Sequence, residues 1–337
     1  MTKLKTSYMG LELKNPIIVG ASNLVSNTDN LRKMEEAGAA AVVYKSLFEE
    51  QIQLETAQMD DELGEYAERH AEMTSLFPHL EHAGPREHLM NVKKAREILS
   101  IPLIASLNAV YKETWIEYAK LLEDAGVDGL ELNFYYVPRD AAIAGSEVEN
   151  EQIEILKLVK SSLSIPVSVK LSPFYANPLN VIHKMDATGV DAFVLFNRIF
   201  QPEIDIVKEE HVVDFPLSST YESKLPLRFA GLLYGNVRAD IISNRGIQQG
   251  DDVIRMILAG ADAVQVVGTL YRNKISHIGK MLKDIEKWMD GKKYKSLQDF
   301  RGKLSNKKLN DPFVYKRAQY IDLLLKSDSI LKEKGLL

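Results

Sequence analysis

Residues 258–269 read LAGADAVQVVGT, a helix end that runs directly into an apolar stretch. Gly260 fits the C-terminal cap of a helix, where the backbone needs a left-handed conformation. The apolar run that follows has no polar alternation, as expected of a strand covered on both faces. This segment predicts a helix joined by a very short turn to a buried parallel strand.

The same pattern recurs at 36–46 (EAGAAAVVYKS), 124–133 (DAGVDGLELN) and 187–197 (ATGVDAFVLFN). A second kind of strand is entered through proline, at 15–22 (NPIIVGAS), 101–108 (IPLIASLN) and 165–172 (IPVSVKLS). One further strand, ADIISNRG, starts at Ala239 and is the seventh of the series. Strands that alternate with helical patterns about eight times predict an α/β protein with a closed (β/α)8 TIM barrel. An open doubly wound sheet is the alternative, but the similarity of alternate strands matches the alternating layers of a barrel interior.

This barrel is expected to fill residues 1–290 as a single domain. Two insertions interrupt it: residues 48–88, which are too long for an ordinary loop and predict a lid, and residues 199–224 after the sixth strand. Residues 291–337 are expected to form a helical extension packed on the barrel. Two insertions at one end of a barrel predict a substrate cover or a dimer surface.

Charge and composition exclude several function classes. The net charge of -5 provides no basic field for nucleic acid or anionic lipid. The absence of cysteine excludes disulfides, thiolate zinc sites and cysteine-ligated iron–sulfur clusters in this chain. No run of 18 apolar residues occurs, so we expect no membrane span and a cytoplasmic location.

In a TIM barrel the functional residues gather where the strands end. Two lysines and three asparagines close apolar strands here, which packing alone does not explain, since a buried lysine is costly unless it is paired or functional. Snorkelling or a local ion pair is the structural alternative for each lysine. The strand-end residues are Ser22, Lys45, Ser46, Asn108, Asn133, Lys170, Asn197, Ser243, Arg245, Gly246, Gly268 and Thr269.

Two glycine-containing turns follow the seventh and eighth predicted strands, in NRGIQQGDD and VVGT. Gly246 and Gly268 would let backbone N–H groups approach a phosphate at the start of the next helix. Each glycine taken alone is equally explained as a turn residue.

The histidines suggest a competing metal site, because HLEH places His79 and His82 three residues apart. No strand end supplies a histidine or carboxylate to complete such a site. We therefore read His70, His79, His82 and His88 as solvated loop residues and expect no metal.

Taken together, the motifs resemble those of the dihydroorotate dehydrogenases, a family of FMN-dependent barrels. The similarity extends from about Asn15 to Leu304, and order and spacing make it specific. It is carried by NPIIVGAS, VVYKS, LELN, VSVKLSP, LFN, ISNRGIQQGDDVIRMILAGADAVQVVGTLY and YKSLQDFRGKL.

This resemblance implies FMN as cofactor and oxidation of dihydroorotate to orotate, in pyrimidine biosynthesis, with hydride transfer to flavin N5. It places Ala21 and Ser22 beside the flavin, and Lys45 with Ser46 against its ring. Asn108 and Asn133 would bind the ring edge, Lys170 would lie near N1 and O2, and Asn197 would reach the substrate. Ser243, Gly246, Gly268 and Thr269 would hold the phosphate, with Arg245 as a possible partner. The candidate catalytic residues are Lys45, Asn133, Tyr136 and Lys170.

The chain departs from the family pattern after Asn133. Relatives follow this asparagine with a Cys or Ser base, then Pro and Asn, whereas this chain reads FYYVPRD and places Tyr136 or Val137 at the base position. The asparagine-bearing lid motif is also missing. Tyrosine is a poor base at neutral pH but a competent proton donor. Alternatively, Tyr135 and Tyr136 only stack on the flavin or the lid.

Three functions follow for a protein that acts on a small-molecule substrate and can form a homodimer. The first is a dihydroorotate dehydrogenase-like enzyme with a non-standard base. The second is an FMN-binding protein with another substrate or without dehydrogenase activity. The third is a Schiff-base lyase that uses Lys170 or Lys45.

Overall fold

The computed structural model describes residues 2–62, 84–137, 140–212 and 215–335. Within these residues eight parallel strands pair in a closed ring, because the first, β3, bonds to both β4 and the last, β13. A short additional strand, β5 (Leu47–Phe48), pairs with the end of β6. In order around the ring, the strands are β3 (Ile17–Val19), β4 (Ala41–Val43), β6 (Leu103–Asn108), β7 (Gly129–Asn133), β8 (Val167–Leu171), β9 (Ala192–Leu195), β12 (Asp240–Ser243) and β13 (Ala263–Val266). The prediction of a TIM barrel is confirmed.

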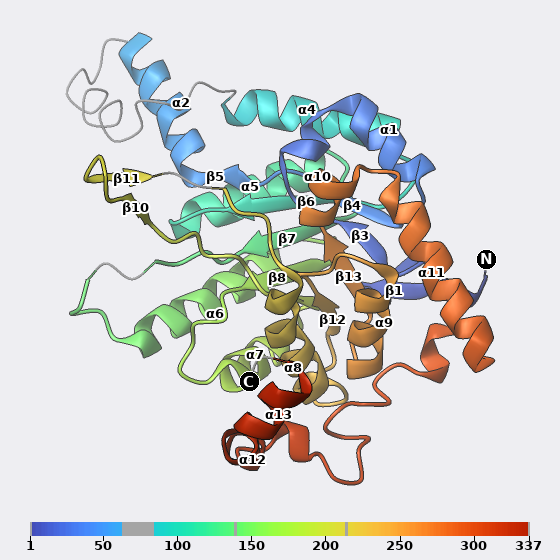
Figure 1. Ribbon diagram of the computed structural model, residues 1–337. Helices are drawn as coiled ribbons and strands as arrows, with labels where there is room; N and C mark the ends of the chain where they lie inside the picture. The colour runs from blue at the N-terminus through green and yellow to red at the C-terminus, as the bar shows by residue number, and fades with distance from the viewer. Residues whose placement is uncertain (1, 63–83, 138–139, 213–214, 336–337) are drawn as a thin grey trace.

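Helices cover the outside of this ring, as Figure 1 shows. They are α1 (Thr28–Glu36), α4 (Pro85–Ile98), α5 (Lys112–Asp124), α6 (Gly145–Ser162), α7 (Pro178–Asp186), α8 (Lys224–Leu233), α9 (Gly250–Ala259), α10 (Gly268–Asn273) and α11 (His277–Lys292). The turn at Gly260 behaves as predicted. Gly260 ends α9 with φ of 134°, and a Cβ there would lie 2.5 Å from Cβ of Tyr234, so no other residue fits.

A small hairpin closes the amino end of the barrel. Its strands β1 (Thr6–Tyr8) and β2 (Leu11–Leu13) follow the 3-10 turn η1 (Thr2–Leu4) and place Tyr8 and Leu13 against the apolar lower layer of the interior. Burial of each such side chain contributes about 1.5–3 kcal/mol to the free energy of unfolding. The amino end is therefore packed, and open space is left at the carboxyl end, where β3 leads into η2 (Asn23–Ser26).

The described parts of both predicted insertions lie at the carboxyl end of the strands (Figure 1). The first begins with α2 (Glu49–Glu62), and its residues 63–83, with His70, His79 and His82, lie outside the described residues. The second holds the antiparallel pair β10 (Glu203–Asp205) and β11 (Glu210–Val212), followed by η3 (Thr220–Ser223). That they act as a lid stays a prediction. The prediction that His88 is a solvated loop residue is wrong, because it is buried on α4, which begins at Pro85.

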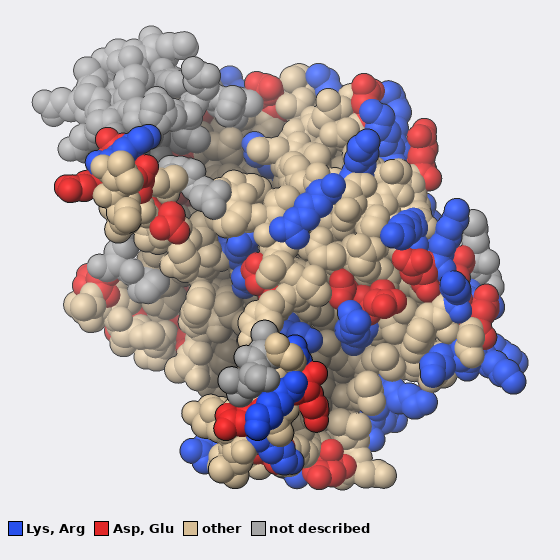
Figure 2. All heavy atoms as spheres, in the orientation of Figure 1, with Lys and Arg blue, Asp and Glu red and all other residues tan. Residues whose placement is uncertain are grey.

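After α11 the chain crosses α8 and α9 through η4 (Leu297–Asp299) and η5 (Phe313–Tyr315) and ends in α12 (Ala318–Leu325) and α13 (Ser327–Glu333). Arg228 of α8 donates to the carbonyls of Val314 and Tyr315, at 3.1 and 2.8 Å. The predicted domain boundary at residue 290 falls in the last turn of α11 and stays a prediction. Among the described helices, none combines the length and apolar character needed to cross a membrane. On the face shown in Figure 2, basic and acidic side chains are interspersed.

Candidate functional site

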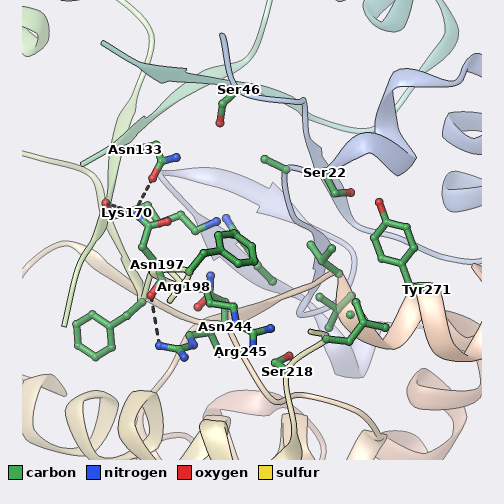
Figure 3. Close-up of a pocket in the computed structure, with 18 of the residues that line it drawn as sticks. Ser22, Ser46, Asn133, Lys170, Asn197, Arg198, Ser218, Asn244, Arg245 and Tyr271 are labelled. Atoms are coloured by element: carbon green, nitrogen blue, oxygen red, sulfur yellow. Dashed lines mark hydrogen bonds between the residues drawn. The ribbon is translucent and has the colours of Figure 1, made fainter. Parts of the chain in front are cut away.

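A cavity of about 550 Å³ opens at the carboxyl end of the barrel strands (Figure 3). Its volume lies within the range of small-molecule sites. Ten of the predicted site residues line it together: Ala21, Ser22, Lys45, Ser46, Asn133, Lys170, Asn197, Arg245, Gly246 and Gly268. The sequence motifs, which lie up to about 250 residues apart, therefore meet at one place, as a barrel requires.

Four other predicted residues are not in the cavity lining. Asn108 supports the site from outside, since its side chain donates to the carbonyl of Asn133 at 2.9 Å. Ser243 is fully buried at the end of β12, and the hydroxyl of Thr269 donates to the carbonyl of Gln248 at 3.0 Å. Tyr136 is partly exposed, and its neighbour Tyr135 lines the cavity instead.

Asparagine side chains tie three strand ends together. Nδ2 of Asn197 donates to Oδ1 of Asn133 at 2.5 Å and also lies 3.3 Å from the carbonyls of Phe134 and Lys170. These bonds hold the ends of β7, β8 and β9 in fixed register. Asn133 is therefore held on its backbone and its side chain at once, as a rigid ligand-binding site requires.

Beneath these residues lies a buried carboxylate, Glu131, which is 0% exposed. Its Oε1 is 3.6 Å from Nζ of Lys170, and its Oε2 accepts a hydrogen bond of 2.5 Å from Nε2 of Gln265. Lys170 and Gln265 both line the cavity. Lys170 therefore reaches the site with an anionic partner. Neither Glu131 nor Gln265 was predicted from the sequence as a site residue. A signal was present, because each is a lone polar residue inside an apolar strand, in LELN and VQVV.

Glycine backbone at Gly246 and Gly268 forms another part of the cavity lining. Gly246 has φ of +66°, and a Cβ there would lie 2.5 Å from the amide nitrogen of Ser223, so the position requires glycine. Its N–H donates to Oγ of Ser218 at 3.2 Å. Arg245 before it also has a left-handed backbone, with φ of 69°. Two successive left-handed residues are a costly arrangement for a non-glycine, typical of functional sites.

Arg245 and Arg198 share one carboxylate, that of Glu222. Nη2 of Arg245 lies 2.6 Å from Oε2 of Glu222, and Nη2 of Arg198 lies 3.8 Å from Oε1. Burial by itself would raise the pKa of Glu222. The hydrogen bonds from Arg245 and from the Ser219 backbone, with the charge of Arg198, outweigh burial and lower this pKa below its usual value. Glu222 is thus held as an anion that fixes both guanidinium groups.

A wall of aromatic side chains forms the outer part of the cavity. The rings of Phe200 and Phe215 stack with centroids 5.4 Å apart, and the backbone amide of Phe200 donates to the hydroxyl of Tyr135 at 3.2 Å. Arg198 lies over the ring of Phe200, 5.8 Å from its centroid, and Phe48 completes the wall. These phenylalanines could not be predicted as site residues, because residues 199–224 carry no strand-end pattern.

Lys45 reaches the cavity from the end of β4, with His88 behind it. Burial, and then the positive charge of Lys45, lower the pKa of His88 to about 4. His88 is therefore neutral near pH 7, and its ring meets that of Tyr44 edge to face, with centroids 5.6 Å apart. An uncharged histidine at this position does not repel the lysine.

The cavity fits the group that the sequence motifs imply. Four buried polar atoms on its lining residues have no hydrogen-bond partner among the described residues: Oγ of Ser22, Oδ1 of Asn244, Nε of Arg245 and Oε1 of Gln265. Unpartnered buried polar atoms are costly, so a polar ligand that pairs with them is favoured. The ring of a flavin carries such groups along its edge, and the glycine backbone suits a phosphate. The described part of the chain holds no cluster of three or more side chains arranged for a metal ion.

Comparison with known proteins agrees with this site. The family model for dihydroorotate dehydrogenase matches residues 3–289. The catalytic subunit of dihydroorotate dehydrogenase B (NAD(+)) from Thermoplasma volcanium is 28% identical over 308 residues, which cover 90% of this chain and 98% of the relative. The subunits of the same name from Methanocaldococcus jannaschii (27% identical, 80% and 87% covered) and Listeria monocytogenes (26%, 91% and 100% covered) are similar. The chain is an oxidoreductase and belongs to the dihydroorotate dehydrogenase family.

Proposed function

We propose that the protein binds FMN in this cavity and uses it to oxidise or reduce a carbon–carbon bond of a small substrate, with dihydroorotate as the first substrate to test. One observation carries this proposal. Lys45, Asn133 and Lys170 line the same cavity as Gly246 and Gly268. Polar groups for a flavin ring and a cradle for its phosphate are thus both present.

The residues of this chain have separate tasks in the proposal. Lys170 provides positive charge on the side of the flavin where negative charge accumulates on reduction. Asn133 and Ser22 would bind the ring edge. A phosphate at Gly246 would replace the hydroxyl of Ser218 as acceptor of the amide N–H, and that hydroxyl could then donate to the phosphate. The bound FMN supplies the hydride acceptor at N5.

Tyr135 is the residue that we propose for proton transfer. Its hydroxyl oxygen already accepts the Phe200 amide proton, so its own O–H is available for a substrate in the cavity. This assigns to Tyr135 the task that the sequence analysis gave to Tyr136. A proton donor suits a reductive direction better than removal of a proton from dihydroorotate does.

The aromatic wall favours a second candidate, an FMN enzyme of the same family that acts on another substrate. Phe200, Phe215 and Tyr135 present ring surfaces to the cavity, which suit a planar or apolar molecule. The substrate asparagines of the family pattern are absent from the sequence after Asn133. Binding of a neutral aromatic compound in preference to dihydroorotate would support this candidate.

The experiment is reconstitution of the purified protein with FMN, followed by anaerobic titration with dihydroorotate under an absorbance spectrometer. We expect a yellow protein with equimolar FMN. Bleaching by dihydroorotate supports the first candidate, and a yellow protein that stays oxidised supports the second. A protein that takes up no FMN would overturn both and leave the Schiff-base lyase with Lys170 or Lys45. Gly246→Ala is the matched control, since it should abolish specific uptake.

We also propose an assembly and a location for the protein. The relatives named above are catalytic subunits, and this cysteine-free chain cannot itself ligate an iron–sulfur cluster through thiolates. We propose a cytoplasmic enzyme that forms a homodimer and passes electrons to a separate acceptor. Light scattering of the purified protein measures its oligomeric state.

A further inference from the structure

Glu131 lies at the centre of the barrel, directly below the candidate flavin site. It precedes Asn133 by two positions on β7, and side chains two apart on a strand point to the same face. The register pairs Glu131 with Ser168 and Asn133 with Lys170 on the neighbouring β8. The interior thus holds a polar layer beneath the cavity, although Glu131 itself is not in the cavity lining.

This layer connects the barrel floor to the cavity. From below, the hydroxyl of Tyr8 lies 3.4 Å from Oε2 of Glu131 and 2.9 Å from Oγ of Ser168. From above, Gln265 donates to Oε2 and Lys170 lies 3.6 Å from Oε1. Burial, then the charge of Glu131, raise the pKa of Tyr8 well above its usual value. Tyr8 therefore stays protonated and acts only as a hydroxyl.

A buried carboxylate is costly unless charges and hydrogen bonds compensate it. Lys170 forms an ion pair with Glu131 at the base of the cavity. The bond from Gln265 has a second consequence. Because its Nε2 is engaged with Glu131, its Oε1 has no partner among the described residues and is left as an acceptor.

We infer that Glu131 is a positioning residue that sets the electrostatics of the flavin site through Lys170 and Gln265. Its carboxylate partly offsets the lysine charge, and so limits how strongly the site stabilises a negatively charged flavin. It also fixes the amide of Gln265 so that Oε1 can accept the N–H of the flavin pyrimidine ring. This inference rests on the proposed function, because it concerns the bound flavin.

The test compares Glu131→Gln with wild type in FMN-loaded protein, without turnover. Sulfite adds to oxidised flavin and places negative charge on the ring, so its dissociation constant reports positive charge nearby. We expect Glu131→Gln to bind sulfite about tenfold more tightly, which is about 1.4 kcal/mol, and the midpoint potential to become more positive. Lys170→Met should change both quantities in the opposite direction.

Two further variants separate positioning from stability. Glu131→Asp keeps the charge and should return sulfite affinity toward the wild-type value. Ser168→Ala removes a buried hydroxyl of the same layer that bonds to Tyr8 but not to Lys170 or Gln265, so it should leave sulfite affinity unchanged. If Glu131→Gln does not fold, Glu131→Asp against Ser168→Ala still tests the idea. The shorter aspartate moves the charge away from Lys170, so sulfite affinity and midpoint potential should shift in the direction expected for Glu131→Gln but by less, and Ser168→Ala should shift neither.

The outcomes distinguish this inference from the proposed function. No FMN uptake by the wild type would overturn the proposed function and the inference with it. Normal FMN uptake with unchanged sulfite affinity and potential in Glu131→Gln would overturn the inference alone. An equal change in Ser168→Ala would also overturn it, because a general disturbance of the barrel layer would then explain the result.

Discussion

The side chain of Asn197 donates a hydrogen bond to that of Asn133 over 2.5 Å, and so links the ends of β9 and β7 across β8. The same nitrogen faces the carbonyls of Phe134 and Lys170. One amide group thus serves three acceptors at the centre of the candidate site, and the site geometry depends on a donor at position 197.

Asn197→Asp should destabilise the protein more than Asn197→Ala. Alanine leaves the three acceptors without their donor, at a cost of about 1–3 kcal/mol in the free energy of unfolding. Aspartate adds a carboxylate oxygen that faces them, which adds repulsion. Urea unfolding of both variants measures this order. Asn180→Ala and Asn180→Asp, at an exposed asparagine, are the matched controls and should change the free energy of unfolding only slightly. Equal stability of the two Asn197 variants would contradict the expected order.

Tyr135→Phe should lower turnover by about 10² while FMN stays bound, if the Tyr135 hydroxyl transfers the proton. Tyr136→Phe is the matched control, because Tyr136 does not line the cavity, and it should retain near-normal turnover. Steady-state kinetics of both variants with the substrate identified by flavin titration make the comparison. A hydroxyl that only anchors Phe200 would instead raise KM and leave kcat intact.

Gly246→Ala should lower the free energy of unfolding by more than about 2 kcal/mol, since it combines a left-handed backbone with a forced contact. The added Cβ would lie 2.5 Å from the Ser223 amide nitrogen and 2.6 Å from the Ser219 carbonyl oxygen. Gly291→Ala is the control. Gly291 lies within α11 with nothing within 4 Å, so alanine there should stabilise by about 0.5–1 kcal/mol. A neutral Gly246→Ala would mean that the loop shifts freely.

The sequence predicted the barrel because its signal is local and repeated. Gly260 caps a helix whatever surrounds it, and proline before a buried run starts a strand. The strand ends Lys45, Asn133 and Lys170 followed from the barrel, since topology alone brings strand ends together.

The parts that were missed depend on contacts between distant segments. The role of Glu131 in the site depends on its hydrogen bond with Gln265, which lies 134 positions away in the sequence. The wall of Phe200 and Phe215 comes from an insertion without a periodic pattern. His88 was misjudged because its burial depends on how α4 packs beside Tyr44. The choice between Tyr135 and Tyr136 was open in the sequence, because the direction of a side chain after a strand end is set by the loop it contacts.

Acid should destabilise the protein through His88. Its pKa falls from an ordinary value of 6.5 to about 4 in the folded protein, through burial and then the charge of Lys45. Below pH 6.5 His88 therefore becomes protonated in the unfolded chain, whereas in the folded protein it binds this proton only near pH 4. Stability is unaffected above this window and falls as the pH is lowered through it, by about 3 kcal/mol in total, after which the loss is constant.

His88→Leu should remove that dependence. Its stability at pH 7 can be lower through altered packing, but the slope of the unfolding free energy between pH 6.5 and 4 should be smaller than in wild type by up to about 1.4 kcal/mol per pH unit. Urea unfolding at several pH values gives both slopes, and His183→Gln, at an exposed histidine, should keep the wild-type slope. Parallel curves for wild type and His88→Leu would show that His88 takes up its proton as easily in the folded protein as in the unfolded chain, and so that neither burial nor Lys45 acts on it as the structure indicates.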